Sequence, residues 1–457
     1  MFGTSGFAGN PGTNGTELAG TGGALGRLGG LTFFKDFGNT ADLDADFAKG
    51  LRTATFTASR GAANPATYID ADGVIQLTTT SNQGRFTKGY YDSSGFSSAK
   101  GLLIEGASTN IFVSGQIDAN NAWNGVALEY SGTSRWNVQE NGAGATTRTV
   151  SVDTANNIGA RSASVEITNA GAAATDVKFR ATNTVILSDS VPYTISFYVK
   201  ADAAKTIPLV IFEAEDDFTS FLNTTFDTVA NTWVRIEKTF TPTTNGASDP
   251  AAMEIRLGNL GLFTILFESL QIEQLAFASS FIPTTTAALT RNKETLKYYI
   301  AGNRTANEES FSIRASMEFT DSGVESNTRY WTDTDTKSRD ATREFNNFSF
   351  RPNSSDSVDS NVFQFKDMVG EENVLHVLSG SIQHSNPYVV VYYDGVTIGG
   401  EEGVDDYTDP AWGTFFYIGS NNAANSHLYG VVGSIAFFNR SLNPDVHKTI
   451  NTLLIGA

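Results

Sequence analysis

Carboxylates are the residues of this 457-residue chain best suited to chemistry. The run Glu213–Asp217 follows the apolar stretch 207–212, and Asp405, Asp406 and Asp409 form a second acidic stretch. Glycoside hydrolysis needs two carboxyl groups that face each other across a sugar, about 5–10 Å apart depending on the mechanism. Sequence spacing does not establish such facing. We therefore expect solvated acidic loops, with calcium binding as the alternative, because oxygen ligands in flexible loops suit that ion.

Histidine and cysteine offer little catalytic potential. The four histidines are His376, His384, His427 and His447, and none lies in a nucleophile-elbow or zinc-protease pattern. The chain contains no cysteine, which excludes disulfides, thiolate metal sites and cysteine nucleophiles. We predict no catalytic residues and expect the protein not to be an enzyme.

Three aromatic residues are the candidates for a glycan-binding site. Sugars are bound by exposed aromatic planes that amide and carboxylate groups flank. Trp331, Tyr388 and Trp412 lie in surroundings rich in Asp and Asn. The chain has 32 Phe, 15 Tyr and 5 Trp, so most aromatic side chains must fill cores, and packing remains the alternative for each of the three.

A further acidic segment, 333–340, is similar to the start of a calcium-binding loop. Lys337 occupies a ligand position in it, and the glycine of the turn is missing. The segment therefore departs from the calcium-loop pattern at two positions.

The charge balance limits the classes of partner. Lysine and arginine number 31 against 49 aspartate and glutamate, for a net charge of −18. Nucleic-acid affinity depends on cations that neutralise phosphates, so we expect no nucleic-acid partner. The same acidity disfavours anionic membrane surfaces, and no stretch approaches the roughly 20 apolar residues of a membrane span. The start, MFGTSGFAGNPG, lacks the basic and apolar regions of a secretory signal, so we expect synthesis in a cytoplasm and no membrane insertion.

Short β-strands between polar turns are predicted along most of the chain. Residues 193–200 and 252–257 alternate with period two, as strands do. Helical spacing is nearly absent before the C-terminus, where Asn443 and Pro444 predict the start of a short amphipathic helix. The pattern predicts an all-β fold: two antiparallel β-sandwich (jelly-roll) domains, an extended Gly-rich N-terminal arm and a short C-terminal helix.

The domain organisation follows from composition. Residues 1–30 are a Gly-rich arm, residues 31–285 a first jelly-roll region, residues 286–300 a polar linker, and residues 301–457 a second sandwich. Within the first region, residues 31–125 could alternatively form a separate attachment subdomain.

Three runs resemble a module that is common in structural proteins of tailed bacteriophages. They are ATYIDADGVI at 66–75, KGLLIEGASTN at 100–110 and EQLAFASSFIPTT at 273–285. The resemblance implies a virion protein of the tail-fibre, spike or head-fibre type. It also implies that residues 1–30, with glycine at every third position from 3 to 15, attach to other virion proteins. A flexible arm is the alternative for that composition.

The middle of the chain resembles the jelly-roll carbohydrate-binding modules. The similar segments are ASVEI at 163–167, YTISFYVKAD at 193–202, WVRI at 233–236 and FESLQI at 267–272. The resemblance implies a glycan partner. It also implies a structural calcium at the first acidic residue of the closing strand, which corresponds to Glu268.

The last third resembles the laminin-G/concanavalin A-like lectin fold. The similar segments are YVVVYYDGV at 388–396, FFYIGS at 415–420 and LYGVVGSIAFFNRSL at 428–442. Enzymes of this fold often carry an E-x-D-x-x-E run, which we do not find here.

Together these patterns favour a displayed virion protein that adsorbs to host-surface glycans. We expect it in the virion, made in the host cytoplasm, as a homo-oligomer and most simply a trimer. The alternatives are a purely architectural capsid-decorating or collar protein, a glycan-degrading enzyme with an accessory binding module, and a bacterial adhesin. No cofactor is expected beyond the structural calcium.

Overall fold

The computed structural model describes most of the chain in segments. These are residues 31–36, 57–59, 65–78, 84–112, 122–123, 127–130, 133–140, 148–159, 163–170, 177–213, 220–243, 250–258, 260–285, 287–299, 308–317, 327–332, 340–344, 347–351, 363–367, 374–383, 388–402, 415–419, 428–438 and 440–455. They form antiparallel sheets and one C-terminal helix, so the prediction of an all-β sandwich fold is confirmed.

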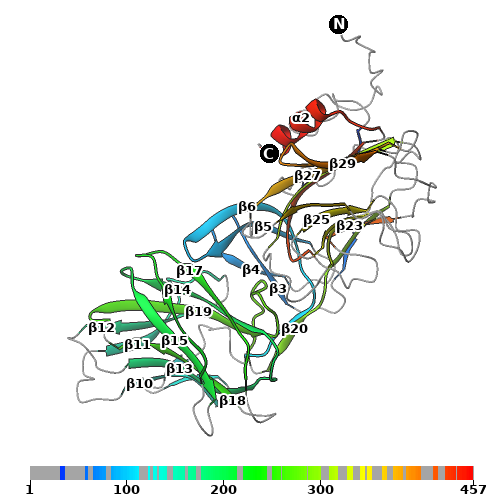
Figure 1. The fold of residues 1–457 in the computed structure, drawn as a ribbon. Coiled ribbons are helices and arrows are strands. Elements are labelled where there is room, and N and C mark those ends of the chain that lie inside the picture. Colours follow the sequence, from blue (N-terminus) through cyan, green and yellow to red (C-terminus); the bar gives the residue numbers. More distant parts are fainter. Residues whose placement is uncertain are drawn as a thin grey trace.

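The first sandwich consists of two sheets. The five-stranded sheet has the order β11 (Arg148–Asp153), β12 (Ser164–Asn169), β19 (Phe263–Glu273), β14 (Tyr193–Ala201) and β17 (Val234–Phe240). The seven-stranded sheet has the order β16 (Ser220–Asp227), β15 (Thr206–Glu213), β18 (Pro250–Arg256), β13 (Val177–Ile186), β10 (Thr133–Glu140), β9 (Ala127–Tyr130) and β8 (Ala122–Trp123). Both sheets lie at the lower left of Figure 1.

One apolar core joins these two sheets. Ile195 and Phe197 of β14 pack in the same buried cluster as Phe179 of β13, Ile211 of β15 and Ile255 of β18. Alternation along each strand sends every second side chain into this core. The intervening residues of β13, β15 and β18 therefore lie on the outer face of the seven-stranded sheet.

A second pair of sheets forms the C-terminal sandwich. One sheet has the order β29 (Val396–Glu402), β28 (Tyr388–Tyr393), β27 (His376–Gln383), β22 (Glu308–Met317), β31 (Gly430–Phe438), β6 (Gly95–Ile104) and β5 (Arg85–Asp92), with β1 (Leu31–Asp36) also on β31. The other has the order β2 (Thr57–Ser59), β21 (Thr295–Tyr299), β30 (Phe415–Ile418), β23 (Asn327–Thr332), β24 (Asp340–Glu344), β25 (Asn347–Arg351) and β26 (Phe363–Asp367).

The strand pairing corrects two of the expected domain boundaries. We expected residues 31–285 to belong to the first jelly-roll region, but β1 and β6 both pair with β31 of the C-terminal sandwich, and β2 pairs with β21. We expected residues 286–300 to be a linker, but they contain β21 and also β20 (Leu289–Arg291), which pairs with β7 (Ser108–Asn110). β31 is buried along its whole length, so its backbone groups need hydrogen-bonding partners on both edges, and β1 and β6 share one of them.

The glycines of the KGLLIEGASTN run permit close approach to the C-terminal sandwich. A Cβ atom on Gly101 would overlap the carbonyl oxygen of Val432, and one on Gly106 would overlap the hydroxyl of Tyr429. Figure 1 shows β3 (Ala66–Ile69) and β4 (Ile75–Thr78) in blue between the first sandwich and strands β5 and β6 of the C-terminal sandwich. This run therefore belongs to the region that connects them.

The C-terminal helix agrees with the sequence prediction, and a tight hairpin joins β28 to β29. Helix α2 (Pro444–Ile455) begins after Asn443, whose side-chain oxygen accepts a hydrogen bond from the Val446 N–H at 3.0 Å. Ile450 and Leu454 are buried on the face of the helix that packs against the C-terminal sandwich. The turn from β28 to β29 is formed by Asp394 and Gly395, both at positive φ, as a two-residue hairpin requires.

Candidate functional site

A groove lies on the outer face of the seven-stranded sheet of the first sandwich. It crosses the adjacent strands β13, β18, β15 and β16 and has a volume of about 410 Å³. Its lining, here called the outer groove, consists of Lys178, Arg180, Val210, Phe212, Ser220, Asn223, Glu254 and Arg256. On β13, β15 and β18 the core residues have odd numbers, and the six residues that line the groove have even numbers. Because side chains alternate between the two faces of a strand, the groove is built from the face opposite the core.

Three cations surround one carboxylate in the outer groove. Glu254 lies 3.5 Å from the Lys178 ammonium, 3.5 Å from Arg256 Nε and 3.9 Å from Arg180 Nε. The register explains the grouping, because Arg180 is directly opposite Glu254 and Lys178 is directly opposite Arg256. Glu254 is buried, and a buried carboxylate requires this kind of charge compensation.

The floor of the outer groove is apolar. Val210, Phe212 and Ala252 form a small buried cluster, and the Arg180 guanidinium lies 5.4 Å from the centre of the Phe212 ring. That distance is typical of a cation–π contact. Asn223, on the edge strand β16, is exposed and adds an amide with both donor and acceptor groups. An apolar floor with a few polar groups around it is the usual composition of a small-molecule site.

The sequence-predicted aromatic residues lie in the other sandwich. Trp331 is on β23 and Tyr388 is the first residue of β28, and these strands belong to different sheets. Trp412 lies outside the described residues. The fold does not place Trp331 and Tyr388 on one sheet, and the glycan role of all three residues stays a prediction.

The acidic candidates give no metal centre among the described residues. Glu268 is buried on β19, and its Oε2 accepts a hydrogen bond from the Ile158 N–H at 2.9 Å. No group of three or more His, Asp or Glu side chains gathers around a common point in the part of the chain that the structure describes. Calcium at Glu268 therefore stays a prediction. Glu213 is the buried last residue of β15, and the acidic stretches 214–217, 333–339 and 405–409 lie outside the described residues.

The outer groove could not be recognised from the sequence. Its charged residues occur as Lys178 and Arg180 on either side of Phe179, and as Glu254 and Arg256 on either side of Ile255. Such alternation is equally typical of an ordinary solvated sheet face. To recognise the groove, one would need to know that β13 and β18 are neighbours in the sheet. More than sixty residues of chain separate the two strands.

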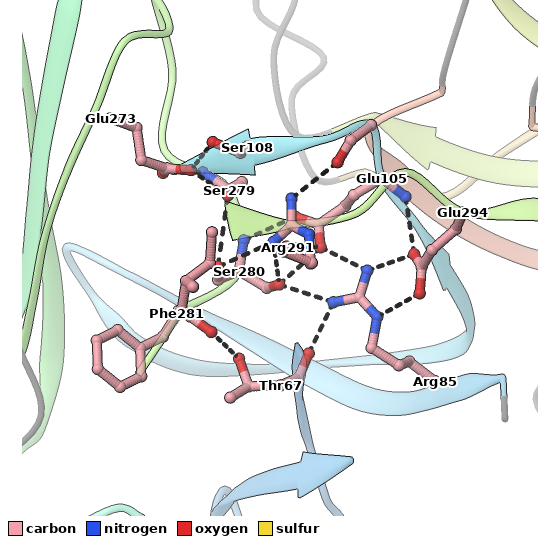
Figure 2. A network of polar contacts seen from close by, with 12 residues as sticks. Thr67, Arg85, Glu105, Ser108, Glu273, Ser279, Ser280, Phe281, Arg291 and Glu294 are labelled. Atoms are coloured by element: carbon pink, nitrogen blue, oxygen red, sulfur yellow. Dashed lines mark hydrogen bonds and ion pairs between the residues drawn. The ribbon is translucent and has the colours of Figure 1, made fainter. Parts of the chain in front are cut away.

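The three unusual runs of the sequence meet in a second polar cluster. Figure 2 shows this polar junction, which consists of Arg85, Glu105, Glu273, Ser279, Ser280, Arg291 and Glu294. It joins the end of β19, in the first sandwich, to β5, β6 and β21 of the C-terminal sandwich.

Two arginines and two glutamates form the charged half of the polar junction. Arg85 contacts Glu294 through both Nε (2.8 Å) and Nη2, and its Nη2 is also 2.6 Å from Glu105. Arg291 lies 3.1 Å from the same Glu105 oxygen. Burial alone would raise the pKa of Glu105, but Arg291 and Arg85, with hydrogen bonds from Ser280, lower that pKa to about 2.

Glu273 organises the other half of the polar junction. Its carboxylate accepts hydrogen bonds from the Ser279 N–H at 2.9 Å, the Ser279 hydroxyl and the Ser108 hydroxyl. Burial raises the pKa of Glu273, although Arg291 and these hydrogen bonds act in the opposite direction. Thr67, in the first of the three runs, donates to the Phe281 carbonyl at 2.6 Å. The three runs therefore take part in one largely buried network of polar contacts.

Comparison with known families supports a carbohydrate-binding domain. Residues 109–258 match the family model CBM_4_9, a carbohydrate binding domain. The chain thus contains a carbohydrate-binding module of the CBM4/9 type, and every residue that lines the outer groove lies within the matched range. No curated protein sequence matches the chain significantly.

Solved structures with similar folds include two carbohydrate-binding modules. A structure titled for CBM4 structure and function is 23% identical and covers 31% of this chain and 86% of its own, with a TM-score of 0.24. The N-terminal cellulose-binding domain of β-1,4-glucanase C from Cellulomonas fimi is 16% identical and covers 28% and 89%, with a TM-score of 0.22. The binding domain of botulinum neurotoxin DC is 10% identical and covers 36% and 40%, with a TM-score of 0.30. Likeness at these TM-scores carries no functional argument.

The described part of the chain contains no helix with the length and apolarity that a membrane span requires.

Proposed function

We propose that this protein binds glycans and that the outer groove is the binding site. The observation that carries the proposal is the position of the groove: all the described residues that line it fall inside the region that matches a carbohydrate binding domain. Asn223 and the charged groups suit the hydroxyls of a sugar, around the apolar floor that is usual for a small-molecule site.

The small number of carboxylates in the outer groove favours a binding function over a hydrolytic one. Among the described residues that line it, Glu254 is the one acidic side chain, and three cations surround it. A glycosidase needs a second carboxyl group on the other side of the scissile bond. A purely binding protein, without catalysis, is therefore the proposal.

The biological setting we propose is display on a tailed-bacteriophage virion, with adsorption to host-surface glycans. The support is the resemblance of the three runs to phage structural proteins. Their convergence in the polar junction gives those runs a common structural purpose, which is to hold the binding module on the C-terminal sandwich. The second candidate is an architectural role on the capsid. In that role the protein would be a trimer, attached to other virion proteins through residues 1–30.

Binding is tested on an immobilised glycan panel with two variants of the groove. Asn223→Trp is expected to block the groove at its exposed edge strand and to reduce binding at least tenfold, and Asn223→Ala is expected to reduce it less. Thr449→Trp, on the exposed side of α2, is the matched control and should bind as the unmodified protein does. Equal binding by Asn223→Trp would place the glycan site elsewhere.

Two further measurements address the alternatives. Release of reducing ends from the glycans that bind would establish an enzyme. Immunogold labelling of purified virions with antibodies against residues 122–273 tests the setting, and bare virions would exclude display.

A further inference from the structure

We propose that the outer groove selects acidic saccharides, in which a carboxylate or sulfate group binds to the guanidinium groups of Arg180 and Arg256. This inference rests on the proposed function, because it names the class of glycan that the same groove would bind. Three observations carry it.

The first observation is the local sign of the charge. The described lining of the outer groove holds three cations and one carboxylate, in a chain whose net charge is −18. A concentration of positive charge in a hollow attracts anions more strongly than the same charges on a flat, fully solvated surface. A neutral saccharide would gain nothing from this excess.

The second observation is that Glu254 leaves the arginine donors available. The distances from its carboxylate to Arg256 Nε and Arg180 Nε are 3.5 Å and 3.9 Å, whereas a charge-assisted hydrogen bond measures about 2.7–2.9 Å. The Arg256 side chain is 46% exposed and the Arg180 side chain 22%, so a ligand in the groove can reach guanidinium N–H groups of both. An anionic ligand would supply the close acceptor that Glu254 does not.

The third observation is a cross-strand pair of like charges. Lys178 on β13 lies directly opposite Arg256 on β18, and both side chains line the groove. Like charges directly opposite each other in an antiparallel pair destabilise the sheet. Glu254 offsets part of that repulsion, and an anionic ligand would offset the rest, since arginine matches carboxylate and sulfate through two parallel N–H groups.

The experiment compares matched neutral and acidic polysaccharides by affinity electrophoresis and calorimetry. The pairs are a neutral galactan against polygalacturonate, and agarose against a sulfated galactan, at low and high sodium chloride. We expect at least tenfold tighter binding of one acidic member or both, with affinity falling as salt rises. The carboxylated and sulfated arms show which anion the groove prefers.

The variants separate this inference from the proposed function. Arg256→Gln keeps the side-chain length and should weaken binding of the acidic glycan about tenfold or more. Lys448→Gln, which removes an exposed cation on α2, is the charge-matched control and should change nothing. Circular dichroism confirms that each variant is folded.

The two possible failures are distinct. Equal or tighter binding of neutral glycans, with no effect of Arg256→Gln, would overturn the acidic selectivity and leave the glycan-binding function in place. Failure to bind any glycan would overturn both.

Discussion

The outer groove and the polar junction use the same residue types for opposite purposes. In the junction, Arg85 and Glu105 are fully buried and 2.6 Å apart, and every charge has close partners. In the groove, the nearest approach of a cation to Glu254 is 3.5 Å, and the Arg256 side chain is 46% exposed. Tight, closed pairing fixes the relative position of chain segments. Loose pairing with excess positive charge leaves capacity for a ligand.

The difference is also one of charge balance. The junction pairs two arginines with Glu105, Glu294 and the neighbouring Glu273, whereas the groove has three cations for one carboxylate. Carboxylates therefore outnumber cations in the buried junction, whereas cations outnumber the carboxylate in the partly open groove. Variants that remove one arginine from each cluster should therefore have very different consequences.

The largest effect is expected from Arg85→Met, in the polar junction. Removal of this guanidinium leaves Glu294 without its bidentate partner and Glu105 with Arg291 as its remaining cation, so the free energy of unfolding should fall by about 3–5 kcal/mol. Arg256→Met, in the groove, is the matched control and should cost at most about 1 kcal/mol, as exposed ion pairs do. Urea denaturation measures both. Similar losses in the two variants would contradict the distinction between the clusters.

The second largest effect is expected from acid, which should lower the stability that Glu105 contributes to the polar junction. The pKa of Glu105 is about 2 when folded and near 4.5 when unfolded, so the unfolded chain binds more protons between those values. Stability from this group is present above pH 4.5 and is lost as the pH falls toward 2, by about 3 kcal/mol in total. Glu105→Gln should be less stable at pH 6 and show a shallower decline from pH 5 to pH 3. Parallel declines in the two proteins would mean that Glu105 does not titrate in this way.

Gly106→Ala should have an intermediate effect, because it tests the contact that the junction maintains. The new methyl group would overlap the Tyr429 hydroxyl, and overpacking of this kind costs about 1–3 kcal/mol. Tyr429→Leu removes both the hydroxyl and the ring Cζ that the methyl group would overlap, so Gly106→Ala should cost less in that background than in the unmodified protein. If the cost is the same in both backgrounds, the overlap is relieved by a shift of the backbone, and the two sandwiches are less firmly joined than proposed.

The sequence predicts local features of this fold well and long-range ones poorly. The alternation of Tyr193–Lys200 predicts β14, and Asn443 with Pro444 predicts the start of α2, because each signal lies within a few residues. The pairing of Leu102 with Val432 could not be predicted, since hydrophobic alternation shows that a strand is buried without showing its partner. The two predicted domain boundaries, for residues 31–285 and 286–300, were wrong for that reason.

The candidate site shows the same limit. The three unusual runs were visible as sequence, but their hydrogen bonds join residues as far apart as Thr67 and Phe281. The predicted aromatic residues were chosen by type and surroundings, and neither property specifies which sheet a strand joins. The outer groove depends on the adjacency of Arg180 and Glu254, which only the register between β13 and β18 establishes.

The smallest effect on stability, with the largest on binding, is expected from Arg256→Gln. The change relieves the repulsion from Lys178 across the sheet and removes one of the three cations around Glu254, so the two consequences oppose each other. The free energy of unfolding should stay within about 0.5 kcal/mol of the unmodified value, as for most surface substitutions. Thermal unfolding and glycan affinity are measured on the same preparation. A ligand site predicts a loss of affinity without a loss of stability, whereas a structural ion-pair cluster predicts the reverse, so this variant distinguishes what the groove does from what the junction does.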